Sequence, residues 1–334
     1  MKAVLCRQYG GPESLTVEDV PAPQPKAGEL VVAVHAAAVN FPDTLIIADR
    51  YQLKPALPFS PGGEVAGTVK ALGVGANGFA PGDRVIAVCG WGGFAEEVAV
   101  AHTRVVHLPG GVPMEAAAAL VLTYGTTHYA LRERARLRAG ESLLVLGAAG
   151  GTGLSAVQIG KLMGARVIAA ASSDEKLALC REHGADATID YSKEDLREGL
   201  KRLTQGVGVD VVYDPVGGHY TEAALRSMAW DGRLLVIGFA SGEIPRPPLN
   251  LPLLKGCSIV GVYYGGFGEH RPRHHLGLLT ELMQWLVEGR IRPAVTSRRP
   301  LEQAAAVLGE VAARRSLGKT VLTTALGRGE VRAA

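Results

Sequence analysis

Gly-Ala-Ala-Gly-Gly-Thr-Gly, residues 147–153, is the stretch that decides how the middle of this chain folds. It follows the apolar run 143–146, which predicts a strand, and precedes residues 154–163, which predict a helix. Glycines at such a turn let the backbone bend tightly and approach a pyrophosphate, which the first amides of the helix then face. A plain strand-to-helix turn is the alternative. The residues expected to contact the phosphates are Ala149, Gly150, Gly151, Thr152 and Gly153.

Apolar runs recur at similar intervals through the middle of the chain. They predict strands at residues 143–146, 166–170, 187–189, 209–213, 233–237 and 258–262. Helix-like segments separate them, such as residues 175–183, which Gly184 ends. Strands that are apolar on both faces and alternate with helices predict a parallel sheet covered on both sides, as in a doubly wound dinucleotide-binding domain.

The end of the second strand of this sheet bears on the choice between NAD and NADP. NAD sites usually place a carboxylate there, whereas this strand ends in Ser172 and Ser173, with Lys176 one turn later. Hydroxyls and a cation suit a 2′-phosphate, so the sequence favours NADP(H). Asp174 and Glu175 are counter-evidence, although we expect them to charge the start of the next helix. Tyr191 follows the third strand and either helps to hold the phosphate or packs in the core.

Two later loops follow the fourth and fifth strands at residues 214–218 and 238–242. Ligands of open parallel sheets bind beyond the carboxyl ends of the strands, so both loops are expected to contact the nucleotide. The residues concerned are Val216, Gly217, Gly238, Phe239 and Ser241.

The flanking segments differ from the middle. Short strands at residues 30–34, 64–72 and 84–88, cut by glycine and proline, predict a β-barrel or sandwich at the N-terminal end of the chain. The C-terminal end predicts helices at 276–287 and 301–313 and a strand at 319–322. Periodicity alone leaves open whether these segments extend the parallel sheet or return to the first domain.

Composition excludes several classes of protein. Apolar residues make up 47% of the 334 and charged residues 20%, which excludes a disordered chain. The net charge of +3 is too small for an electrostatic nucleic-acid or membrane partner, and the basic residues of 132–138 are expected on a solvated helix. No apolar run is long enough to span a membrane and the N-terminus lacks a signal-peptide pattern, so we expect a cytoplasmic protein. The four cysteines form no C-x-x-C pair and are expected to be small apolar residues in a reducing compartment.

Motifs that run in order through nearly the whole chain carry a family resemblance. They are Tyr-Gly-Gly-Pro-Glu at 9–13, Asn-Phe-Pro-Asp at 40–43, Pro-Gly-Gly-Glu-Val-Ala-Gly at 61–67, Gly-Asp-Arg-Val at 82–85, the loop at 148–153 and Arg-Ser-Leu-Gly-Lys at 315–319. The chain resembles the zinc-free quinone oxidoreductases of the medium-chain dehydrogenase/reductase superfamily, the group that contains zeta-crystallin.

The resemblance implies an α/β protein with a GroES-like β-barrel catalytic domain and a doubly wound (Rossmann) nucleotide-binding domain. The expected boundaries are residues 1–120 for the catalytic domain, 121–264 for the NADP-binding domain and 265–334 for a return segment that completes the first. It also implies a homodimer or homotetramer that pairs through the strand at 258–262.

The resemblance further implies chemistry without zinc. Zinc-dependent relatives have Cys where this chain has Asn40 and His where it has Gly63, and no cysteine lies between Cys89 and Cys180 to form a structural zinc lobe. The histidines at 270, 274 and 275 are expected in a polar surface segment and not at a metal. Hydride delivery from NADPH to a quinone or other α,β-unsaturated carbonyl is then the expected reaction.

Site residues follow from the same resemblance. Asn40 and Asp43 are expected near the nicotinamide, where Asn40 either donates to the acceptor oxygen or only orders its loop. Tyr51 is expected on the substrate side, either as a hydrogen-bond donor or as a wall of the cleft. The further expected residues are Thr123, Thr127 and Arg315 for the cofactor, and Tyr264 and Phe267 for the acceptor.

Two other functions stay open. An enoyl-thioester reductase acting on acryloyl- or crotonyl-CoA would use the same fold, with Arg246, Arg271 and Arg273 as weak candidates for the CoA phosphates. A non-enzymatic NADPH- or RNA-binding protein like zeta-crystallin is the alternative of another class. NADPH oxidation with a simple quinone would separate the enzyme from the binding protein.

Overall fold

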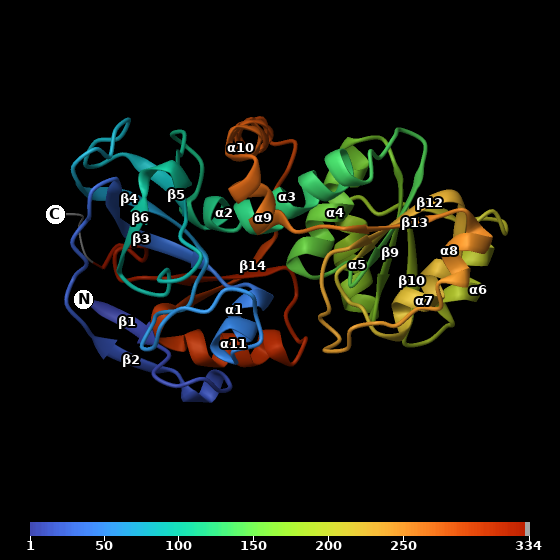
Figure 1. Ribbon diagram of the computed structural model, residues 1–334, viewed down its shortest axis with the longest axis horizontal. Coiled ribbons are helices and arrows are strands. Elements are labelled where there is room, and N and C mark those ends of the chain that lie inside the picture. Colours follow the sequence, from blue (N-terminus) through green and yellow to red (C-terminus); the bar gives the residue numbers. More distant parts are fainter. Residues whose placement is uncertain (331–334) are drawn as a thin grey trace. The chain divides into compact units, whose positions relative to one another are not determined.

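The computed structural model describes residues 1–330 and divides into two compact units (Figure 1). Of the described residues, unit 1 contains Met1–Leu122 and residues 292–330, and unit 2 contains Thr123–Ile291. The first and the last described segments therefore belong to the same unit. The second boundary differs from the expected one, because residues 265–291 belong to unit 2 and do not return to the first domain. Their helices pack on unit 2: Phe267, for example, stacks on Tyr129 with ring centroids 4.2 Å apart.

Unit 2 contains the expected parallel sheet. Its six strands lie in the order β10-β9-β8-β11-β12-β13, and every pairing is parallel. The strands are β8 (Ser142–Leu146), β9 (Arg166–Ala171), β10 (Ala187–Asp190), β11 (Val209–Asp214), β12 (Met228–Val236) and β13 (Ser258–Gly261). The order reverses direction between β8 and β11, which is the doubly wound arrangement.

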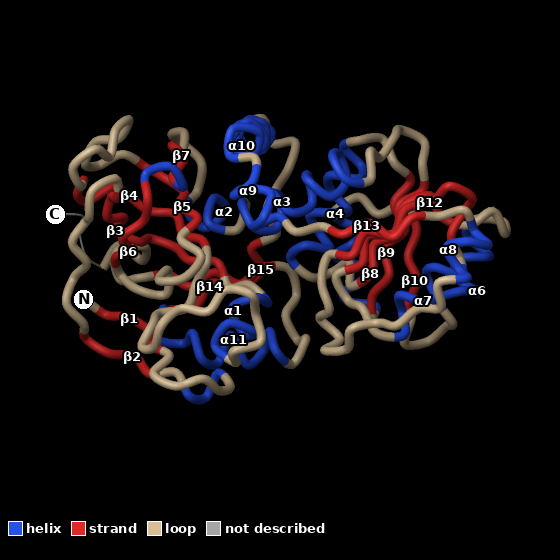
Figure 2. Tube along the Cα trace, in the orientation of Figure 1, coloured by secondary structure: helices blue, strands red, loops and turns tan. Residues whose placement is uncertain are grey.

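Helices alternate with these strands along the chain (Figure 2). They are α3 (Val121–His128), which begins in unit 1, α4 (Gly151–Leu162), α5 (Asp174–Glu182), α6 (Leu196–Leu203), α7 (His219–Arg226), α8 (Asn250–Lys255), α9 (Tyr264–His270) and α10 (Pro272–Val287). Leu144, Ile168 and Val212 have no exposed surface, as continuous apolar runs in a covered sheet require. The basic residues of 132–138 were expected on one helix, but the structure does not place them on one. A π-helical segment, Tyr129–Arg134, follows α3, and Arg136 has a φ of 50°.

Unit 1 is built on a seven-stranded sheet in the order β14-β15-β3-β4-β5-β7, with β6 also paired to β3. The strands are β3 (Glu29–Ala38), β4 (Glu64–Leu72), β5 (Arg84–Val88), β6 (Glu97–Ala101), β7 (Val105–His107), β14 (Val295–Pro300) and β15 (Lys319–Thr323). The long strand β3 pairs with β6 along its first half and with β15 along its second half. Strand β15 therefore belongs to unit 1 beside β3, a point that periodicity alone had left open.

The remaining elements of unit 1 are short. They are the antiparallel pair β1 (Lys2–Leu5) and β2 (Thr16–Asp19), helices α1 (Phe41–Ile47), α2 (Met114–Ala118) and α11 (Ala304–Ala312), and 3-10 turns at Pro12–Ser14, His102–Arg104 and Leu301–Gln303. Val32, Val65 and Leu308 are among the core residues on which these elements pack. Within residues 1–330, no helix has the length and apolar character needed to cross a bilayer.

Candidate functional site

The glycine loop joins β8 to α4. Its glycines differ in how much space surrounds them. A Cβ on Gly153 would lie 2.4 Å from the carbonyl oxygen of Gly147, so helix and strand can approach this closely only with glycine there. Gly150 is open instead, since a Cβ there would meet its nearest neighbouring atom at 3.5 Å. Gly150 also precedes α4 without a side chain that caps the helix, so no side chain of the N-cap accepts from the amides of the first turn. This is the arrangement that holds phosphates.

The loops after β11 and β12 meet beside the glycine loop. A Cβ on Gly147 would lie 2.9 Å from Val216, and the amide of Ser241 donates to the carbonyl of Val216 at 2.8 Å. The Asp214 carboxylate accepts from the amides of Val216 and Gly217, both at 2.9 Å. The residues of both loops that were expected to contact the cofactor thus lie at one edge of the sheet. Gly238 and Phe239 are among them.

The end of β9 is where the 2′-phosphate is expected. The Lys176 ammonium donates to the Ser172 hydroxyl at 3.1 Å, whereas the Ser173 hydroxyl caps α5 by accepting from the Lys176 amide. Ser173 therefore has a structural task that its predicted role did not include. Asp174 lies in the first turn of α5 as expected, and its carboxylate pairs with Lys193 at 2.5 Å.

Lys193 is a residue that the sequence analysis missed. It lies 19 residues from Asp174 along the chain, and no local pattern connects the two. Its ammonium lies 2.5 Å from Asp174 and 3.4 Å from Asp190, so it is shared by two carboxylates and only partly offsets Asp174. Asp174 is one of the two acidic residues, with Glu175, that count against a phosphate at this strand end. Tyr191 lies nearby, its amide bonded to the Ala171 carbonyl and its ring 4.5 Å from that of Tyr220.

Thr123 and Thr127 lie against the start of α4. The Thr127 hydroxyl is fully buried and shares hydrogen bonds with Ser155 at 2.6 Å and Tyr213 at 3.0 Å. The carbonyl of Thr123 accepts from the same Ser155 hydroxyl at 3.2 Å. Both threonines therefore lie beside α4. The Thr127 hydroxyl is already hydrogen-bonded to Ser155 and Tyr213.

Tyr264 and Phe267 are both buried within unit 2. The Tyr264 hydroxyl bonds to His275 at 2.8 Å and lies so close to α3 that a Cβ on Gly125 would be 2.1 Å from it. His270 and His274 are exposed as expected, whereas His275 is half-buried and packs against Tyr264. Phe267 stacks on Tyr129.

In unit 1, four polar side chains from distant parts of the sequence form one buried cluster: Asn40, Asp43, Glu64 and Lys319. The Lys319 ammonium donates to Asn40 Oδ1 at 2.6 Å and lies 3.6 Å from Glu64 Oε1. Asn40 Nδ2 donates to Glu64 Oε1 at 3.0 Å and to the Ala38 carbonyl at 3.2 Å. Asp43 Oδ2 accepts from the Asn40 amide at 2.8 Å.

Burial dominates the electrostatics of this cluster. It raises the pKa of Asp43 to about 7, against the hydrogen bond from Asn40 and the charge of Lys319. It also raises the pKa of Glu64, while the nearby Lys319 ammonium works in the opposite direction. The pKa of Lys319 is lowered by burial and supported by Glu64. The three ionisable groups therefore depend on one another for their charge states.

Glu64 and Lys319 are the members that sequence analysis did not single out. Each lies in a motif of the family resemblance, and each adjoins an apolar strand, where a charged residue is a signal of burial with a partner. Of the other expected residues in unit 1, Tyr51 is half-buried against the core and Arg315 is exposed after α11. Within residues 1–330, no three side chains of His, Cys, Asp or Glu gather as metal ligands.

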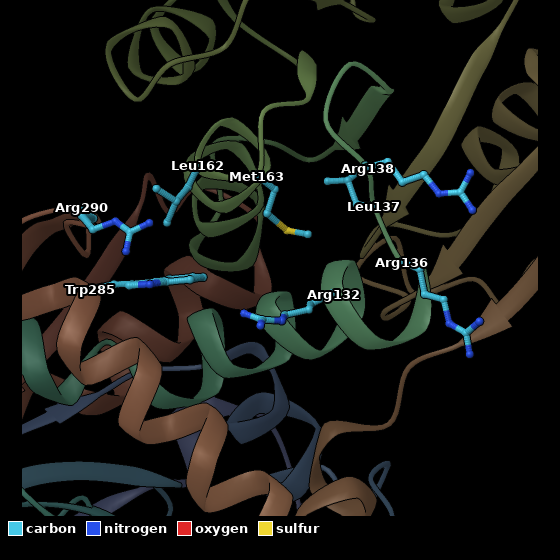
Figure 3. Close-up of a pocket in the computed structure, with 8 residues that line it drawn as sticks. All are labelled: Arg132, Arg136, Leu137, Arg138, Leu162, Met163, Trp285 and Arg290. Atoms are coloured by element: carbon cyan, nitrogen blue, oxygen red, sulfur yellow. The ribbon is translucent and has the colours of Figure 1, made fainter.

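A hollow of about 480 Å³ in unit 2 lies apart from the glycine loop (Figure 3). Arg290 lies over the Trp285 ring at 5.3 Å, and Arg132 is paired with Glu281 at 2.5 Å. Arg136 and Arg138 also line the hollow, but their guanidinium groups point away from Trp285 (Figure 3). The four arginines do not converge on one point, so the hollow lacks the geometry of an anion site.

Two family models match the chain. The alcohol dehydrogenase GroES-like domain matches residues 26–110, and the zinc-binding dehydrogenase model matches residues 151–281. The first match confirms that the β-rich domain is GroES-like. The second covers the glycine loop and most of the parallel sheet.

Similar proteins cover nearly the whole chain. A quinone oxidoreductase-like protein 2 homolog of Nematostella vectensis is 38% identical over 97% of this chain and 89% of that protein. The quinone oxidoreductase of Pseudomonas syringae is 33% identical with a TM-score of 0.91, covering 96% of this chain and 99% of that one. The Escherichia coli quinone oxidoreductase complexed with NADPH is 29% identical with a TM-score of 0.90, covering 97% and 100%.

Proposed function

Because the chain belongs to the quinone oxidoreductase family, we propose that it binds NADPH along the carboxyl edge of the unit 2 sheet and reduces a quinone or another α,β-unsaturated carbonyl. The observation that carries the proposal is the uncapped start of α4 behind the open Gly150, at the point where the strand order reverses. NADPH supplies the hydride. The protein binds and orients both reactants and excludes water.

The nucleotide contacts follow the order of the loops. The amides of residues 150–153 and Ala149 face the pyrophosphate, and the joined loops with Val216, Gly217, Gly238, Phe239 and Ser241 hold the next part of the nucleotide. Ser172 and Lys176 hold the 2′-phosphate, with the cap of Ser173 keeping the segment in place. Lys193 partly offsets Asp174, although it also pairs with Asp190. Tyr191, Thr123, Thr127 and Arg315 are the remaining cofactor residues of the proposal.

The acceptor side is proposed to use Tyr51 as the hydroxyl donor, with Tyr264 and Phe267 as apolar support. Both amide hydrogens of Asn40 are already bonded within the protein, which favours its alternative role of ordering the loop. Asp43 fixes the same loop through the Asn40 amide. We also propose that the reaction needs no zinc. Neither Asn40 nor Gly63 offers the thiolate or imidazole of a zinc ligand, and the Asn40 oxygen already holds an ammonium.

The assembly is proposed to be at least a homodimer that pairs through β13. This strand lies at the edge of the sheet and Ile259 on it is 41% exposed. On the neighbouring helix α8, Leu253 and Leu254 are 78% and 69% exposed. We expect Ile259→Lys to produce monomers in sedimentation experiments at micromolar concentration. Monomers of the parent protein would contradict the proposal.

A screen of NADPH consumption against quinones, enones and enoyl-CoA thioesters tests the reaction. Turnover of quinones or enones is the expected result. Turnover of enoyl-CoA alone would identify an enoyl-thioester reductase, and tight NADPH binding with no turnover would identify a binding protein. Full activity only with bound zinc would overturn the zinc-free reaction.

The cofactor choice is tested separately by Lys176→Ala. A charge-assisted contact to phosphate contributes about 1.5–3 kcal/mol, so NADPH should bind roughly ten- to a hundredfold more weakly while NADH hardly changes. Lys201→Ala on α6, an exposed lysine of the same unit, is the matched control. An equal loss for both nucleotides would make Lys176 structural, and a preference of the parent enzyme for NADH would overturn the NADPH assignment.

A further inference from the structure

Lys319 is a buried cation whose hydrogen-bonding capacity is used by unit 1 itself. Its side chain begins β15 and is only 6% exposed. The ammonium donates to the Val39 carbonyl at 2.8 Å and to Asn40 Oδ1 at 2.6 Å, and Glu64 Oε1 lies 3.6 Å away. An ammonium has three N–H donors, and it meets three oxygen atoms here.

The two charges determine which way the Asn40 carboxamide faces. Its oxygen meets the Lys319 ammonium, and its nitrogen meets the Glu64 carboxylate and the Ala38 carbonyl. A half-turn of the amide, which exchanges its oxygen and nitrogen, would place the NH₂ group against the ammonium and the oxygen against the carboxylate. Both contacts would be repulsive, so the pair selects one orientation.

The same pair also anchors the start of α3. Glu64 Oε2 accepts from the Leu122 amide at 2.8 Å, in the first turn of that helix, while its Oε1 faces Asn40 and Lys319. Thr123, a proposed cofactor residue, is the next residue in the chain. A carboxylate at a helix N-terminus is favourable, provided that the carboxylate stays ionised. Lys319 supplies the positive charge of the cluster, and its ammonium lies 3.6 Å from Glu64 Oε1.

We infer that Lys319 is a positioning residue of the proposed reductase: its ammonium orients the Asn40 carboxamide and holds Glu64 on the first turn of α3. Through Val39, Asn40 and Glu64 it fixes the segments that lead to α1 and α3. The inference rests on the proposed function as far as turnover is concerned, whereas the orientation of Asn40 is a property of unit 1 alone.

The kinetic test compares Lys319→Met with Lys70→Met. Lys70 is an exposed lysine of the same unit, paired with Glu97 and outside the cluster. A misplacement of about 1 Å in a reacting site can cost about a hundredfold in rate, so we expect Lys319→Met to lower kcat for a quinone by about that factor. The NADPH dissociation constant should change far less than kcat, because Lys319 donates to Val39 and Asn40 and to none of the residues proposed to hold the phosphates. Lys70→Met should change neither.

Chemical rescue separates positioning from folding. Lys319→Ala removes the three terminal carbons and the ammonium of the side chain, which n-propylammonium can replace. We expect n-propylammonium to restore kcat at least about tenfold, and neutral n-propanol to have no effect because it lacks the charge. Turnover is expressed per NADPH-binding site, so unfolded protein does not contribute. Equal rescue by both compounds, or a loss that only follows the number of binding sites, would overturn the inference.

A spectroscopic arm makes the result independent of turnover. The Nδ2 protons of Asn40, assigned by their absence in Asn40→Leu, should give two separate and slowly exchanging NMR signals in the parent protein and in Lys70→Met. In Lys319→Met both protons should exchange with solvent at least about tenfold faster, since the carboxamide is no longer held in its hydrogen bonds. Unchanged signals in the folded variant would overturn the inference even if kcat fell.

The arms also distinguish this inference from the proposed function. If the parent protein turns over no quinone or enone, the proposed function fails and the NMR comparison alone decides the role of Lys319. If Lys319→Met does not fold, Lys319→Ala prepared with n-propylammonium keeps the test, and removal of the n-propylammonium should accelerate the same exchange at least about tenfold. Unchanged exchange after its removal would then overturn the inference.

Discussion

The start of α4 in unit 2 and the Asn40–Lys319 cluster in unit 1 are opposite ways to build a polar region. Residues 147–153 are consecutive, carry no ionisable side chain and leave the first amides of α4 without a side-chain cap. The cluster contains three ionisable groups, of which Lys319 and Glu64 pair with each other while Asp43 accepts from the Asn40 amide. Polar groups left open in a fold are available to a ligand, whereas groups that satisfy one another fix a geometry.

The two regions should therefore respond differently to substitution. Damage to the cluster should appear first in the free energy of unfolding, because burial makes an unpaired charge costly. Damage to the open part of the glycine loop should appear in nucleotide binding, with the fold intact.

The largest expected effect is the loss of stability in Lys319→Met. Removing one partner of a buried ion pair leaves the other uncompensated, so the free energy of unfolding should fall by about 3–5 kcal/mol in urea titrations. Lys70→Met, which breaks an exposed pair with Glu97, should cost at most about 1 kcal/mol. A loss below about 1 kcal/mol in Lys319→Met would show that Glu64 is not a buried charge that depends on Lys319.

Asp43 should give the next largest effect, seen in the pH dependence of stability. Burial raises the pKa of Asp43 to about 7 in the folded protein, from 3.8 for an ordinary aspartate. The folded state therefore binds more protons between these values, and its stability should fall as the pH rises from about 4 through 7. The contribution of this one carboxyl amounts to about 2–4 kcal/mol.

Unfolding titrations of the parent protein and of Asp43→Asn at pH 5, 6, 7 and 8 measure this contribution as a difference. The difference should change with pH for Asp43→Asn but not for Asp49→Asn, whose side chain is exposed and paired with Lys54. Parallel pH profiles of the parent protein and Asp43→Asn would show that Asp43 keeps an ordinary pKa.

Gly153→Ala tests the closed part of the glycine loop. The new Cβ would lie 2.4 Å from the Gly147 carbonyl oxygen and 2.6 Å from that of Ala148, and backbone atoms cannot move aside cheaply. We expect a loss of about 1–3 kcal/mol in the free energy of unfolding, together with weaker NADPH binding. Unchanged stability would mean that α4 does not pack on β8 as closely as the structure has it.

Gly150→Ala is the counterpart of Gly153→Ala in the part of the loop that has room for a Cβ. It should have the smallest effect on stability. Its φ of −78° suits alanine and its Cβ meets nothing within 3.5 Å, so stability should stay the same or rise by up to about 1 kcal/mol. NADPH should nevertheless bind roughly tenfold more weakly, because the methyl group occupies the space proposed for the phosphates. Unchanged affinity, measured by fluorescence titration, would place the phosphates elsewhere.

The features that could be predicted from the sequence are those that neighbouring residues determine. The six parallel strands were visible because a sheet covered on both faces requires continuous apolar runs. The glycine loop was visible because its glycine spacing lies within seven consecutive residues. The second domain boundary was wrong for residues 265–291, since the apolar faces of α9 and α10 fit either domain until their partners are known.

The candidate site was predictable only in part, for the same reason. Ser172 and Lys176 lie one helical turn apart, so their contact can be inferred from spacing. The pairing of Lys193 with Asp174 depends on β9 and β10 lying side by side, and only the sheet order reveals it.

By itself, the sequence determined the fold class, the glycine loop between a strand and a helix, and the family, because these depend on periodicity, glycine spacing and ordered motifs. Only the tertiary structure decided that Lys319 and Asn40, 279 residues apart, would meet. It also decided that the Asn40 amide, for which donation to the acceptor was one of two expected roles, is used within the protein. A buried charge must find its partner wherever the fold brings one, and the chain order carries no record of that choice.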